Sequence, residues 1–138
     1  MPLIGNVING VSVRYGPGVN QNVDPRVIEG LRRVIKPNIA DGHVLSEIYI
    51  SSANDQHELP SRHVLGGGKA VDISRINGMR MAVFYTMNAS VKAIVDAIQT
   101  AFETYTYRRE NFGPFFKKKL GAPMSIGGHL DHIHLSVN

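Results

Sequence analysis

The segments AVDI at residues 70–73 and HIHLSV at residues 132–137 decide how this chain of 138 residues folds. Successive side chains of a β-strand point to opposite faces, and both segments alternate in that way. Their apolar residues would enter a core, while Asp72, His132 and His134 would point away from it. If the two strands are neighbours, Asp72 and His134 converge on one face.

Helix and strand signals are interspersed along the rest of the chain. A helix capped by Asp24 is predicted to end near Lys36, before a proline. Apolar residues at helical spacing predict a longer helix that starts near Asn88 or Ser90. The pattern favours an α+β fold with a small central antiparallel sheet flanked by helices. The other expected elements are strands at residues 11–15 and 44–50 and a long loop at residues 108–125.

Length and composition predict one domain that occupies residues 1–138. The chain is 43% hydrophobic and 19% charged, which is ordinary for a globular protein. It has no apolar run long enough to span a membrane and no N-terminal pattern of a secretory signal. Because it has no cysteine, any metal must be bound by His, Asp or Glu.

The formal net charge of +4 indicates an anionic partner, either nucleic acid or a polymer of the bacterial envelope. The lysines at 117–119 form a basic run, but the other cations are scattered and no nucleic-acid-binding motif is present. We therefore expect no nucleic-acid partner. The glycines at 66–68 precede Lys69 without the spacing or the hydroxyl residue of a phosphate-binding loop.

The histidines and carboxylates fit the requirements of a hydrolytic zinc site. Such a site needs three nitrogen or oxygen ligands, an open position for water and a separate carboxylate. Asp72 and His134 supply two ligands, and His63 supplies the third from the preceding loop, where His57 is an alternative. Strict alternation puts Asp131 on the wrong face, so this carboxylate must lie at a bend to reach the water.

These motifs resemble the signature of a family of zinc peptidases that act on peptidoglycan. The family includes D-Ala-D-Ala carboxypeptidases and L-alanyl-D-glutamate endolysins, and its pattern is Ser-x-His, Gly-x-Ala-x-Asp and an acidic residue three positions before a His. The resemblance implies a hedgehog/DD-peptidase-like fold. It also implies roles for individual residues: His63, Asp72 and His134 as zinc ligands, Asp131 as general base and His132 as a second site histidine.

The chain departs from the family pattern at two positions. Eight residues separate His63 from Asp72, where the family usually has six, and the extra pair falls among flexible glycines. No arginine occupies residues 50–54, where the family arginine holds a substrate carboxylate. We assign Ser61 and Arg62 to substrate binding, and Arg75 is an alternative to Arg62.

Taken together, the sequence predicts a monomeric zinc peptidase that hydrolyses amide bonds in peptidoglycan stem peptides. The absence of a signal peptide predicts a protein that stays in the cytoplasm until it is released to the cell wall, as phage lysins do. The alternative is a non-catalytic zinc-containing binding domain of the same fold. His129, which follows two glycines, is a weaker candidate for the site.

Overall fold

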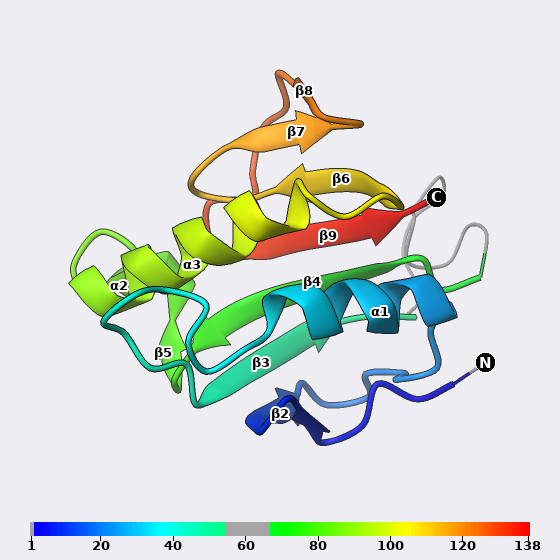
Figure 1. Ribbon diagram of the computed structural model, residues 1–138, viewed down its shortest axis with the longest axis horizontal. Coiled ribbons are helices and arrows are strands. Elements are labelled where there is room, and N and C mark those ends of the chain that lie inside the picture. Colours follow the sequence, from blue (N-terminus) through cyan, green and yellow to red (C-terminus); the bar gives the residue numbers. More distant parts are fainter. Residues whose placement is uncertain (1, 55–66) are drawn as a thin grey trace.

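The computed structural model describes residues 2–54 and 67–138, which form a mixed α and β structure (Figure 1). Within these residues one mostly antiparallel sheet has nine strands in the order β1-β2-β3-β4-β9-β6-β7-β8, with β5 paired to β4. The expected α+β class is confirmed. The strands are β1 (Val7–Ile8), β2 (Val11–Tyr15), β3 (Glu47–Ser52), β4 (Ala70–Ile76), β5 (Met79–Arg80), β6 (Arg108–Phe112), β7 (Lys117–Lys119), β8 (Ala122–Pro123) and β9 (Ile133–Val137).

Two helices, α1 (Pro25–Val34) and α3 (Ala89–Phe102), lie across the same face of the sheet, and the short α2 (Met81–Phe84) precedes α3 (Figure 1). The Asp24 carboxylate caps α1 by accepting a hydrogen bond from the Arg26 amide at 2.9 Å. The Asn88 side chain caps α3 in the same way. Both helix starts agree with the sequence prediction.

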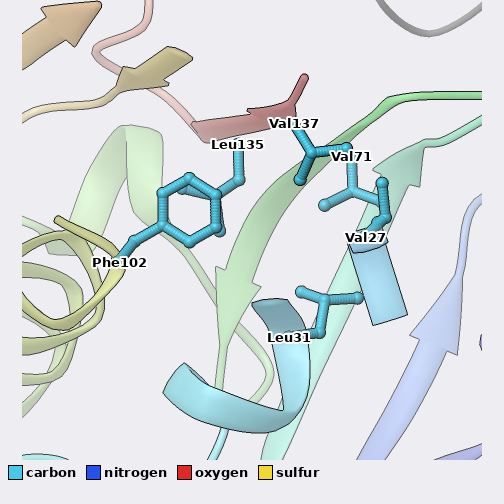
Figure 2. A pocket seen from close by; sticks show the side chains of 6 residues that line it. All are labelled: Val27, Leu31, Val71, Phe102, Leu135 and Val137. Atoms are coloured by element: carbon cyan, nitrogen blue, oxygen red, sulfur yellow. The ribbon is translucent and has the colours of Figure 1, made fainter. Parts of the chain in front are cut away.

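The core fills the space between these helices and the sheet. Val71 and Ile73 of β4 and Ile133 and Leu135 of β9 are fully or almost fully buried there, as alternation predicted. Figure 2 shows a small apolar pocket on this side of the sheet, with no room for a water molecule. It is lined by Val27, Leu31, Val71, Phe102, Leu135 and Val137.

Two predicted boundaries are shifted because local hydrogen bonds end the regular structure. The first helix ends at Val34 rather than near Lys36, since Ile35 has an extended backbone. The strand expected at residues 44–50 begins at Glu47. The residues just before it bond to the Asn77 side chain and to the Pro37 carbonyl, and the Ser46 carbonyl accepts a hydrogen bond from Ser12 of β2.

The prediction of a long loop at residues 108–125 is wrong, because this segment forms β6, β7 and β8. Leu120 and Gly121 both have positive φ, 52° and 81°, which is the geometry of a two-residue hairpin turn between β7 and β8. The lysines of β7 do not alternate with apolar residues, so the sequence carries no period-two signal there. The sheet consequently extends past β9 on both sides.

No helix in residues 2–54 and 67–138 combines the length and the apolar character that crossing a membrane requires.

Candidate active site

Asp72 and His134 lie opposite each other on the paired strands β4 and β9. The Asp72 Oδ1 and His134 Nδ1 atoms are 2.8 Å apart. Their side chains are only 16% and 11% exposed, on the sheet face that α1 and α3 leave uncovered. Strand alternation therefore brings together the two side chains for which the sequence predicted convergence.

Glu110 of β6 contacts the other side of the same imidazole. Its Oε1 atom is 3.1 Å from His134 Nε2 and accepts a hydrogen bond of 2.9 Å from the Ser136 hydroxyl. Glu110 was not among the predicted site residues, because its segment was predicted to be a loop. The available signal for a strand was that Glu110 and Phe112 would share one face while Asn111 points to the other. Three residues are too few to identify a strand.

This arrangement favours the charged forms of His134 and Glu110. Burial lowers the pKa of His134, but hydrogen bonds and attraction from Asp72 and Glu110 outweigh burial and raise it to about 9. Burial raises the pKa of Glu110, but His134, Ser136 and the charge of Lys119 lower it to about 2. His134 is thus held between two carboxylates in a partly desolvated site.

Asp131 and His132 lie at a bend just before β9. The strand β9 begins at Ile133, one residue after the predicted start, and the His132 Nε2 atom lies 3.9 Å from Asp72 Oδ1. The Asp131 Oδ1 atom is 2.7 Å from Nδ1 on the other side of the ring, and the Asp131 side chain is 67% exposed. The His132 hydrogen bond lowers the pKa of Asp131. Asp131 is therefore connected to the Asp72–His134 pair through the His132 imidazole.

Aromatic rings form one wall of the site. Phe112 stacks on His134 with ring centroids 5.7 Å apart, and the His129 ring lies 4.9 Å from that of His132. Gly128 and His129 both have positive φ, which turns the loop back toward the sheet. The Lys117 ammonium anchors the same loop by donating a hydrogen bond to the Ile126 carbonyl at 2.6 Å. Burial and the neighbouring His132 and His134 lower the pKa of His129.

The predicted residues Ser61, Arg62 and His63, and the alternative ligand His57, lie outside the described residues. Among residues 2–54 and 67–138, no group of three His, Cys, Asp or Glu side chains could hold a metal ion. The Asp72 oxygen and the His134 nitrogen are the donor types that zinc prefers, and they face one small volume. They fit zinc as two of its ligands, and a third must come from elsewhere in the chain.

Arg75, the alternative to Arg62 for binding a substrate carboxylate, lies on β4. Its guanidinium packs over the Tyr49 ring at 4.2 Å from the centroid. Arg75 pairs with Tyr49 across β3 and β4. Since Ile48 and Ile50 on either side of Tyr49 are in the core, Tyr49 and Arg75 lie on the uncovered face.

Comparison of the chain with protein-family models, with curated proteins and with solved structures found no match.

Proposed function

We propose that this protein is a zinc-dependent peptidase that hydrolyses amide bonds in peptidoglycan stem peptides. The observation that carries the proposal is the approach of Asp72 Oδ1 to His134 Nδ1 at 2.8 Å, from residues that the sequence motifs identify as ligands. His63 is proposed as the third ligand. We also propose that the finer fold is of the hedgehog/DD-peptidase type, which the mostly antiparallel sheet with helices on one face supports.

Zinc bound at Asp72 and His134 would lower the pKa of a water molecule and polarise the scissile carbonyl. The side chains of Asp131 and His132 would transfer the proton of this water molecule. An ionised Asp131 can only accept a hydrogen bond, so the Nδ1 atom of His132 donates to it and Nε2 is directed toward Asp72. In this mechanism the attacking water gives its proton to the Asp131–His132 pair, which returns it to the leaving amine.

The proposed substrate is anionic, because stem peptides carry free carboxylates and the chain is basic. Arg75 presents a guanidinium on the uncovered sheet face, where the Tyr49 ring orients it. Ser61 and Arg62 are proposed to contact the substrate from the segment that precedes β4. The rings of Phe112 and His129 shield the His134 side of the site from solvent.

The proposal predicts that Asp131→Ala abolishes cell-wall clearing without removing zinc. The measurement is the loss of turbidity of purified peptidoglycan, with the metal content of each protein determined in parallel. We expect a drop in rate of about 10²- to 10⁴-fold, the usual contribution of a general base. Asp41→Ala, which removes an exposed carboxylate in a turn, is the matched control and should clear the wall like wild type.

A second candidate function is a non-catalytic zinc-containing binding domain. The observation that favours it is the Asp131 carboxylate, which is 67% exposed and bonded to its own neighbour. If wild-type protein holds one zinc per chain but clears no wall, this second function replaces the first. If wild-type protein holds no zinc, both are wrong.

A further inference from the structure

We infer that Glu110 is the positioning residue of the metal site, which fixes the orientation and tautomer of the His134 imidazole. The inference rests on the proposed function, and it concerns a residue that no motif identified. It starts from the contact of 3.1 Å between Glu110 Oε1 and His134 Nε2. This contact is on the opposite side of the ring from the one that faces Asp72.

The hydrogen bonds around Ser136 define what Glu110 can do. The Ser136 Oγ atom accepts the Glu110 backbone amide at 2.9 Å, so its hydroxyl hydrogen is directed to Glu110 Oε1, also at 2.9 Å. The carboxylate is thereby held as an acceptor beside His134. Glu110 can then accept a hydrogen from Nε2, as Asp72 can from Nδ1. If zinc took the place of the hydrogen on Nδ1, the Glu110 bond would keep the remaining hydrogen on Nε2 and leave the Nδ1 lone pair to the metal.

The position of the Nδ1 lone pair matters for zinc, since Nδ1 is the atom that faces Asp72 Oδ1 at 2.8 Å. Histidines that bind metals commonly donate their other ring N–H to a carboxylate, and loss of that partner weakens metal binding. Glu110 is 17% exposed and lies next to Phe112, whose ring stacks on His134 at 5.7 Å. Glu110 and Phe112, both from β6, therefore fix the His134 ring.

Glu110→Ala should weaken zinc binding by about 10- to 100-fold, and Glu110→Gln, which keeps an oxygen acceptor, by less. Zinc affinity is measured by competition with a chromophoric chelator, so that no activity is needed. The matched control is Glu103→Gln. Glu103 is also 17% exposed and bonds to Asn111 of the same strand, but on the face toward α3. The control should bind zinc like wild type.

A second readout tests positioning without any metal. In chelator-treated protein, NMR cross-peaks between the His134 and Phe112 rings should persist in wild type and in Glu103→Gln and weaken in Glu110→Ala. If Glu110→Ala does not fold, Ser136→Ala replaces it as the test variant. Ser136→Ala removes the hydroxyl that holds the Glu110 carboxylate, so it should also weaken zinc binding.

The outcomes separate the two proposals. Weaker zinc binding and a mobile ring in the Glu110 and Ser136 variants support the inference. Wild-type affinity in these variants overturns the role of Glu110 and leaves the proposed peptidase intact. A wild-type protein that binds no zinc overturns the peptidase, and the role of Glu110 with it.

Discussion

His134 is the residue in which the contacts of the site are concentrated. Its two ring nitrogens face carboxylates from two different strands, β4 and β6, while β9 supplies the ring itself. A pair of buried carboxylates is tolerated here because a cation lies between them. The same arrangement makes the site sensitive to pH.

We predict that metal-free protein loses stability in alkaline solution because of His134. Its pKa in the folded state is about 9, above the ordinary value of 6.5. The stabilisation is therefore fully present below pH 6.5 and is lost as the pH rises through 9, with a magnitude on the order of 3 kcal/mol. Urea unfolding in chelator at pH 6.5 and pH 9.5 measures it. His134→Gln, which cannot titrate, should lack this part of the pH dependence; an equal loss in both proteins contradicts the prediction.

At the scale of elements, segments with clear alternation or a helix cap were predicted well, including the strand at residues 11–15, and segments without such a signal were not. The capped helices α1 and α3 and the strands β4 and β9 were predicted from local chemistry, and their pairing brings Asp72 to His134. The strands β6 to β8 were missed, because β6 contains an irregularity in register and β7 is a run of three lysines. Glu110 was missed for the same reason.

The N-terminus of α1 is fixed to the sheet by the ion pair between Asp24 Oδ2 and Lys69 Nζ at 3.1 Å. Burial raises the pKa of Asp24, but hydrogen bonds from Arg26 and Lys69 outweigh burial and lower it below 3.8. This stabilisation is present above pH 3.8 and is lost as the pH falls through the folded pKa.

We predict that Asp24→Ala lowers the free energy of unfolding at pH 7 by about 1–2 kcal/mol, since it removes the helix cap and the ion pair. Asp24→Asn keeps the cap and should lose less. Thermal or urea unfolding at pH 7 and pH 2.5 is the measurement. The gap between wild type and Asp24→Asn should narrow as the pH falls below 3.8, and a gap that does not change with pH would show that charge is not its cause.

At the scale of the whole molecule, the sheet separates packing from chemistry. One face carries the helices and the apolar core, and the other carries Asp72, His134 and Glu110. The register of the strands places one cation of this second face on each side of the site. Arg75 lies opposite Tyr49 on one side, and Lys119 lies opposite Glu110 on the other.

Under the proposed function, these cations are expected to contribute to binding the anionic wall. The double substitution Arg75→Gln and Lys119→Gln should weaken cosedimentation with purified peptidoglycan and flatten its dependence on salt, because fewer charges are screened. It should raise KM more than it lowers kcat. The matched control is Arg32→Gln with Lys36→Gln, which removes the same charge at exposed positions of α1 and just beyond it. Equal effects of the two pairs would show that only net charge matters.

The strand β9 follows the other described strands along the chain, yet it lies between β4 and β6. A nascent chain that has emerged as far as β8 already contains Asp72 and Glu110, but it has no His134 to place between them. Among the described strands, β9 is the one that pairs with both β4 and β6, so its insertion makes the sheet continuous and brings His134 to both carboxylates. A chain without β9 cannot place His134 between Asp72 and Glu110, so the proposed activity requires the complete sheet.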